Sequence, residues 1–198
     1  MMIFSPRRGA ALAVAALLLL PLRHATADTV QPRLLPTRDV DVTYEVVQNG
    51  HALPQRIRWS AAARLLRVDP PIPGMFVVVD YDRKHMSLVR EPEHAVLDMT
   101  APDSVMTGLQ NRLDTTTRGS DETVAGLPCT NWRTTDPANK PASACITQDG
   151  VLLQVRSQDR VVLKATSVRF APQDAALFRI PDGFTRVPAD NPPVAGAR

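Results

Sequence analysis

The feature that most constrains the fold is an Asn49-Gly50 dipeptide between two stretches in which apolar and polar residues alternate. This dipeptide favours a two-residue type I′ turn, because both of its positions need a positive φ. Pairing of the flanking strands around the turn sets apolar side chains opposite one another: Val46 with Leu53, Val42 with Ile57, and Val40 with Trp59. A slip of one residue would destroy this pattern, so the sequence predicts an antiparallel hairpin with one apolar face.

Similar patterns continue along the chain. Asp149-Gly150 predicts a second hairpin that sets Ile146 opposite Leu153, and a three-residue loop at 157–159 would then bring Leu153 opposite Leu163. The sequence also predicts a hairpin between residues 75–81 and 85–90, with Phe76–Val79 apolar on both faces, and a short strand at residues 95–99.

Helical signals are few. Residues 103–113 and 173–178 are the segments that predict short helices. The fold class expected is mainly β, a curved antiparallel sheet or half-open β-barrel with one or two short helices.

The first 27 residues carry the features of a cleaved signal peptide. Arg7 and Arg8 form a positive region, Ala10–Leu20 is an apolar run of 11 residues, and Ala25-Thr26-Ala27 is a small-residue cleavage site. A membrane-spanning helix needs about 20 apolar residues, so we expect no stable membrane anchor. The sequence therefore predicts export to the periplasm with cleavage after Ala27.

Cleavage also changes the charge balance. The full chain has a net charge of +3, but the segment to be removed contains Arg7, Arg8, Arg23 and no acidic residue, which leaves 20 basic and 20 acidic side chains. A neutral chain with no run of basic residues lacks the positive field that attracts nucleic acid. We expect no nucleic-acid partner.

The chain divides into four segments on these signals. Residues 1–27 are the predicted signal peptide, residues 28–38 an N-terminal lead-in, residues 39–184 a single β domain, and residues 185–198 a flexible C-terminal tail rich in proline and small residues.

Two cysteines remain after export, Cys129 and Cys145, in a compartment where disulfides persist. We expect them to be bonded, which would stabilise the fold by about 3 kcal/mol for a loop of this length. A reactive or metal-binding thiol would need a CxxC motif or an adjacent histidine, and neither is present.

Motifs for catalysis and cofactors are missing. The sequence holds no G-x-S-x-G, G-x-G-x-x-G, phosphate loop or H-E-x-x-H. His85, Met86, His94 and Met99 are a possible copper set, and Asp80, Asp82 and Glu91 a possible carboxylate pair, but sheet surface and core explain these positions more simply. We expect no enzymatic activity, no cofactor and no metal.

The apolar strand faces are the remaining candidate for function. A sheet must cover its apolar face, and little helix is available to do so. A loosely covered concave face would accept an acyl chain or another apolar ligand, and the best candidate residues are Val42, Ile57, Trp59 and Leu153. The alternative is that loops and short helices close an ordinary core over them.

The C-terminal half resembles exported uncharacterised proteins related to the LolA-like lipoprotein-carrier superfamily. The resemblance rests on Gly126–Trp132, Cys145–Val151 and Phe178-Arg179-Ile180-Pro181-Asp182-Gly183-Phe184. It implies a half-open barrel with a disulfide between strands, a C-terminal segment that closes an edge, and carriage of lipid-modified proteins or apolar molecules. The long helices and the functional arginine of those carriers have no counterpart that we can place here.

Two functions follow as hypotheses. The first is a non-enzymatic periplasmic protein that binds a lipid or other apolar ligand in the concave face. The second is an envelope protein–protein interaction module without a small-molecule ligand, which would dock a partner at a sheet edge or apolar rim.

Overall fold

The fold is described by a computed structural model for residues 31–106, 117–136 and 138–188. The predicted signal peptide lies outside the described residues. The elements are β1 (Val40–Gln48), β2 (His51–Ser60), β3 (Leu65–Asp69), β4 (Met75–Asp80), β5 (His85–Arg90), β6 (Ala95–Thr100), α1 (Asp103–Met106), β7 (Thr117–Val124), β8 (Leu127–Thr135), β9 (Pro141–Ile146), β10 (Leu152–Ser157), β11 (Arg160–Arg169), the 3₁₀ helix η1 (Ala175–Phe178) and β12 (Thr185–Pro188).

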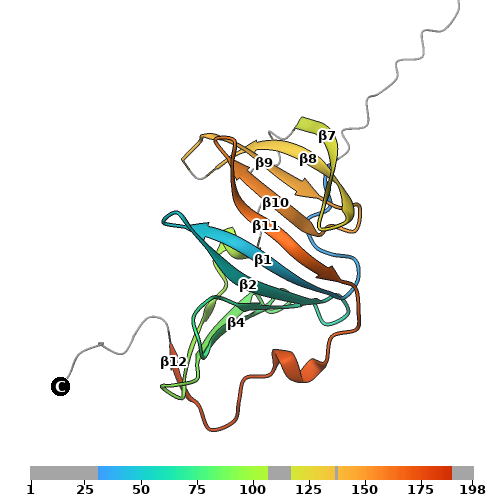
Figure 1. The fold of residues 1–198 in the computed structure, drawn as a ribbon. Coiled ribbons are helices and arrows are strands. Elements are labelled where there is room, and N and C mark those ends of the chain that lie inside the picture. Colours follow the sequence, from blue (N-terminus) through green and yellow to red (C-terminus); the bar gives the residue numbers. More distant parts are fainter. Residues whose placement is uncertain (1–30, 107–116, 137, 189–198) are drawn as a thin grey trace, which may run out of the picture.

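All described strands belong to one open, curved sheet (Figure 1). Its order is β12-β6-β5-β4-β3-β2-β1-β11-β10-β9-β8-β7, so two meanders, β1 to β6 and β7 to β11, join where β1 pairs with β11. Neighbouring strands are antiparallel, except that β12 runs parallel to β6. The expected fold class is confirmed.

The first hairpin has the predicted register. Val46 pairs with Leu53, Val42 with Ile57, and Val40 with Trp59. Asn49 and Gly50 form the turn with φ values of 50° and 79°. The hairpin of β4 and β5 is also confirmed, with His85 opposite Asp80.

The register of the second meander differs from the prediction. Gly150 is the last residue of a turn that begins at Thr147, whose carbonyl oxygen accepts a 3.0 Å hydrogen bond from the Gly150 amide, and Ile146 therefore pairs with Leu152 rather than Leu153. The loop before β11 has two residues instead of three, because Gln158 and Asp159 both adopt positive φ. This loop sets Ser157 opposite Arg160, and a bulge between Val155 and Arg156 then shifts the register so that Leu163 pairs with Val155 instead of Leu153.

The helices are short. η1 begins after Asp174, whose side chain caps it by accepting a 2.9 Å hydrogen bond from the Ala176 amide. Of the helix predicted over residues 103–113, the structure describes α1, and residues 107–116 lie outside the described part. No described helix has the length and apolar character needed to cross a membrane.

The predicted boundary of the C-terminal tail is wrong. Residues 185–188 form β12, which pairs with β6 from Thr185 opposite Ala95 to Pro188 opposite Asp98. Arg186 anchors the strand through a 2.6 Å ion pair with Asp98. Proline ends pairing but is tolerated on an edge strand, and this explains how a proline-rich segment still contributes one.

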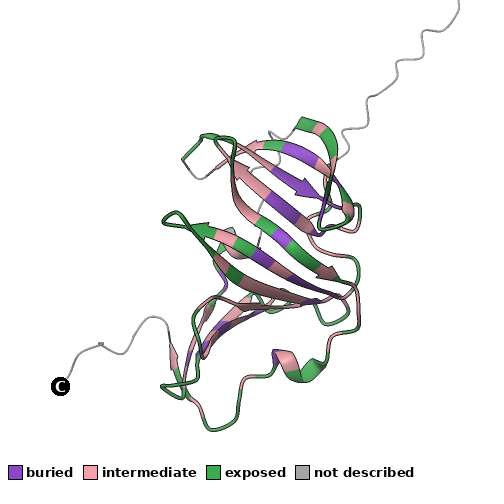
Figure 2. Ribbon diagram, viewed as in Figure 1, coloured by how far each residue is buried: buried purple, intermediate pink, exposed green. Residues whose placement is uncertain are grey.

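The sheet is packed on both faces. The main core gathers Val40, Val42, Tyr44 and Trp59 of the first hairpin with Val124, Cys129, Cys145, Val151, Leu153 and Ala165 of the second meander. A second core lies beneath the C-terminal segment, where Phe178 packs with Phe76, Val78, Val89 and Val96. Figure 2 shows buried positions along the middle of the sheet and exposed positions at the hairpin tip of β1 and β2.

The lead-in is tied to the main core. The Trp59 indole N–H donates a 2.9 Å hydrogen bond to the Pro36 carbonyl oxygen, and the Thr37 amide donates to the Asp149 carbonyl oxygen. A side chain at Gly150 would place its Cβ 2.5 Å from the Leu35 carbonyl oxygen, so only glycine allows this approach.

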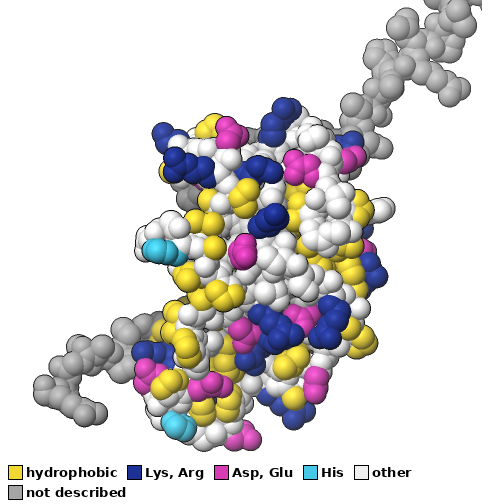
Figure 3. Space-filling view, viewed as in Figure 1, with side chains coloured by type: hydrophobic (Ala, Val, Ile, Leu, Met, Phe, Trp, Pro, Cys, Tyr) yellow, Lys and Arg dark blue, Asp and Glu magenta, His cyan; other side chains and the backbone are white. Residues whose placement is uncertain are grey.

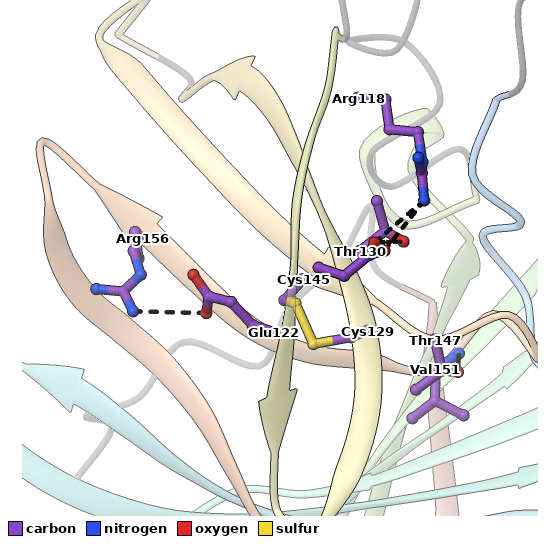
Figure 4. Close-up of a disulfide and its surroundings, with 9 residues drawn as sticks. Arg118, Glu122, Cys129, Thr130, Cys145, Thr147, Val151 and Arg156 are labelled. Atoms are coloured by element: carbon purple, nitrogen blue, oxygen red, sulfur yellow. Dashed lines mark hydrogen bonds and ion pairs between the residues drawn. A yellow bond between two sulfur atoms is a disulfide. The ribbon is translucent and has the colours of Figure 1, made fainter.

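A disulfide joins Cys129 to Cys145, as expected, and links β8 to β9. Both sulfur-bearing residues are buried. Figure 4 shows the ion pair between Glu122 and Arg156 on one side of the bond and the side chains of Arg118 and Thr130 on the other.

Charged side chains are mixed on the surface. Figure 3 shows basic and acidic side chains interspersed on the face in view, with no extended area of one sign. Asp41 is the centre of one such group and lies 2.5 Å from Arg56 and 3.2 Å from Arg169.

Candidate functional site

The four predicted ligand-binding residues lie together, but three of them are fully buried. Val42 and Trp59 are each 1% exposed and Leu153 is 0% exposed, all within the main core. Ile57 is half-buried and packs against that core. The first three side chains therefore form packed interior, and Ile57 marks the border of a less covered region.

That region continues from Ile57 across the sheet. Residues that are paired directly across antiparallel strands share a face. Ile57 pairs with Val68, and the row continues through Val77, Leu88 and Leu97. Each of these side chains is half-buried.

A second row runs beside the first. It starts at Trp59 and continues through its partner Leu66, then Val79, Met86 and Met99. Val79 is buried, and the last two are half-buried methionines, whose flexible thioether chains adapt to irregular shapes. We call the half-buried members of the two rows the apolar face: Ile57, Leu66, Val68, Val77, Met86, Leu88, Leu97 and Met99.

The two faces of β3 to β6 are covered differently. The opposite face carries Phe76, Val78, Val89 and Val96, and the C-terminal segment buries it with Phe178 and the flanking Ile180 and Phe184. On the side of the apolar face, Tyr81 packs edge-on against Trp59 with ring centroids 5.3 Å apart. The Tyr81 hydroxyl donates a 3.3 Å hydrogen bond to the Val105 carbonyl oxygen of α1, so this short helix lies at the Trp59 end.

Tyr44 is buried in the main core, and its hydroxyl group forms a hydrogen bond within the protein. Its hydroxyl donates a 2.7 Å hydrogen bond to the Leu152 carbonyl oxygen. Burial raises the pKa of this phenol far above its ordinary value. Tyr44 is therefore a neutral structural group and no source of a charge.

The possible copper set does not assemble. Adjacent strand residues point to opposite faces, so His85 and Met86 cannot converge. His85 instead lies 3.0 Å from Asp98, and His94 packs against Phe184. Among the residues that the structure describes, no cluster of three or more histidine, cysteine or acidic side chains forms a metal site.

Ser87, His85 and Asp98 are close together, but their arrangement differs from a catalytic triad. The Ser87 hydroxyl donates to Asp98 Oδ1 at 2.6 Å, and His85 Nε2 reaches the same oxygen. Burial opposes ionisation of Asp98, yet hydrogen bonds from Ser87, Arg186 and His85 outweigh it and lower its pKa. His85 Nε2 also lies 3.3 Å from the Ser87 hydroxyl, but that hydroxyl donates to Asp98, whereas the serine of a triad donates to the histidine.

The possible carboxylate pair is also separated. Asp80 accepts hydrogen bonds from the Asp82 and Arg83 amides in the turn between β4 and β5. Glu91 lies in the turn at the other end of β5. Asp80 and Glu91 therefore lie at opposite ends of the hairpin strand β5 and do not form a pair.

The fold places the chain among mainly β proteins built on one open, curved and mostly antiparallel sheet. No protein-family model matches the sequence, and a comparison with curated proteins finds no match either.

Three solved structures are similar to this chain to different degrees. An uncharacterised conserved protein from Thermus thermophilus is 15% identical with a TM-score of 0.57, over 77% of this chain and 91% of that chain. MucB is 13% identical with a TM-score of 0.48, over 74% of this chain and 58% of that one. A structure of MucB in complex with MucA(peri) is 16% identical, over 73% of this chain and 54% of that chain, with a TM-score of 0.47. The first of these similarities shows a shared fold.

Proposed function

We propose that this protein is a non-enzymatic binding protein of the periplasm that holds a lipid or another apolar ligand on the apolar face. The observation that carries the proposal is the continuity of that face across β2 to β6, where every member is half-buried. Half-buried aliphatic side chains gain free energy when a ligand removes their remaining surface from water, by about 25 cal/mol per Å².

The sequence features of export support the proposed location. A signal peptide is the prediction for residues 1–27, and the disulfide between Cys129 and Cys145 suits an oxidising compartment. The curved sheet and its closing C-terminal segment agree with the resemblance to LolA-like proteins, which we propose as the fold family.

A neutral fluorescent probe tests ligand binding directly. The exported protein, purified without detergent, is titrated with N-phenyl-1-naphthylamine, and we expect saturable fluorescence that an unlabelled acyl compound displaces. Leu88→Asp places a charge in the middle of the face and should abolish the signal, because burial of an unpaired carboxylate is costly.

Two further variants make the test specific. Val77→Trp keeps the face apolar but fills the space that the ligand would occupy, so it should also weaken probe binding. It introduces no charge, so it still tests the site if Leu88→Asp disturbs folding. Val47→Asp is the matched control, since Val47 is 41% exposed on the hairpin of β1 and β2 outside the apolar face. Equal binding by all three variants would reject the site.

An envelope protein-interaction module is the second candidate. The observation that favours it is that β7, a polar and mostly exposed strand, stands at the end of the sheet among the described strands. Such an edge accepts an added strand from a partner. Folded protein that binds no apolar probe would support this function over ligand binding.

A further inference from the structure

A groove separate from the apolar face lies between the lead-in and strands β7 to β9. Its volume is about 700 Å³, within the range of small-molecule sites. The apolar part of its lining includes Trp132, Ile146, Pro128 and Pro32. Trp132 and Ile146 are buried and pack with Ala144, so this part is preformed by the sheet.

The polar wall of the groove is built on β7 and β8. Arg118 lies 3.1 Å from Asp121, and the Thr130 hydroxyl donates a 2.7 Å hydrogen bond to the same carboxylate. The Arg118 and Asp121 side chains are 56% and 66% exposed, and an ion pair of this kind contributes little to stability. Arg118 can therefore exchange its partner at small cost, while Thr130 retains Asp121.

The lead-in adds a second guanidinium group to the lining. Arg33 of the lead-in lines the same groove and forms no ion pair with any acidic residue in the described part of the chain. The lining thus carries two arginines and one carboxylate, a net charge of +1 over an apolar floor. Guanidinium groups bind carboxylate and phosphate oxygens through paired hydrogen bonds.

We propose that this groove binds a monomeric amphiphilic anion, which lays its apolar chain on Trp132 and Ile146 and its carboxylate or phosphate between Arg33 and Arg118. The volume of about 700 Å³ argues for a single molecule, whereas a membrane surface would need a flat or protruding face. This site is distinct from the apolar face and stands independently of the proposed function.

The test uses the exported protein and two ligands with chains of ten carbons, one with an anionic carboxylate and one with a neutral hydroxyl. Intrinsic tryptophan fluorescence is followed during titration with decanoate below its micellar concentration and with 1-decanol. We expect decanoate to bind at least about tenfold more tightly, which corresponds to one charge-assisted hydrogen bond. Trp132→Phe should remove most of the fluorescence response, since it leaves only Trp59 of the core.

Single substitutions test which side chains bind the anionic group of decanoate. Arg33→Ala and Arg118→Ala should each weaken decanoate binding about tenfold and leave decanol binding unchanged. Arg83→Ala is the matched control, because Arg83 is an exposed arginine of the turn between β4 and β5. Folded Leu88→Asp protein should keep the decanoate binding that depends on Arg33 and Arg118, which separates this site from the apolar face.

Other results of these titrations would contradict the proposed anion site. Equal affinity for decanoate and decanol, or full affinity in the Arg33→Ala and Arg118→Ala variants, would overturn the proposal. Phosphatidylglycerol vesicles form a second arm, with phosphatidylcholine vesicles for comparison. Cosedimentation with the anionic vesicles that requires Arg33 and Arg118 would assign the groove to a membrane headgroup and would also overturn it. Decanoate binding without any cosedimentation that depends on these arginines supports a monomeric ligand.

Discussion

At the scale of single residues, Asp41 concentrates the charged contacts of the sheet. It is 7% exposed and accepts hydrogen bonds from Arg56 and Arg169 on neighbouring strands, with Arg58 4.0 Å away. The hydrogen bond from Arg56 lowers the pKa of Asp41 and outweighs burial, which raises it. The ionised carboxylate therefore stabilises the fold.

Asp41→Asn should lower the free energy of unfolding by about 1.5–3 kcal/mol at neutral pH, since it removes charged hydrogen bonds from a buried group. The pKa of Asp41 is lower in the folded state, so its contribution is complete above the ordinary value of 3.8 and is lost as the pH falls through the folded value. Urea unfolding of both proteins from pH 7 to pH 2.5 should show the difference shrink below about pH 4.

Asp82→Asn is the control for this prediction. Its ion pair with Arg64 is largely exposed and should contribute less than about 1 kcal/mol. A loss in Asp82→Asn equal to that in Asp41→Asn, or a difference that persists to pH 2.5, would contradict the role given to Asp41.

The lead-in packs closely against Gly150, where a side chain would collide with the backbone of Leu35. Gly150→Ala meets two obstacles, a φ of +88° and the Leu35 carbonyl oxygen 2.5 Å from the new Cβ. Gly126→Ala has a similar φ of +76° with no atom within 4 Å, so it isolates the backbone cost of about 1–2 kcal/mol. We expect Gly150→Ala to lose clearly more stability in urea unfolding. Equal losses would mean that the lead-in does not hold its place against Gly150.

At the scale of elements, the sequence was most informative where a turn has strict geometric needs. Asn49-Gly50 predicted the register of β1 and β2 correctly because a type I′ turn fixes pairing directly. The register predicted from Asp149-Gly150 is wrong, because Gly150 ends a four-residue turn that begins at Thr147. The predicted loop before β11 is one residue too long. The proline-rich composition of residues 185–198 gave no sign of β12, because this strand forms by pairing with β6, which is distant in sequence.

The C-terminal segment should behave as a structural cover. Phe178→Ala removes a buried ring from the core beneath β4 to β6 and should cost about 3–5 kcal/mol. Phe184→Ala removes a half-buried ring of the same segment and should cost less. Thermal unfolding of the two variants measures the difference. A Phe178→Ala protein as stable as the wild type would contradict the assignment of this segment as a cover.

At the scale of the whole molecule, the sequence predicted which side chains gather but not which ones stay accessible. Alternation in each strand was sufficient to place Val42, Trp59 and Leu153 on one side. Their burial depends on the lead-in and the second meander, which long-range packing brings over them. The row of half-buried side chains that includes Val77 and Leu88 could not be predicted, because it depends on the register of all five strands from β2 to β6.

The central claim is that the apolar face holds a ligand, and native mass spectrometry tests it most directly. Protein exported and purified without detergent should carry a noncovalent added mass that denaturation releases, and Val77→Trp should reduce its occupancy. Folded wild-type protein that shows the mass of the chain alone, under conditions that preserve a known lipid-binding protein's ligand, would contradict the account.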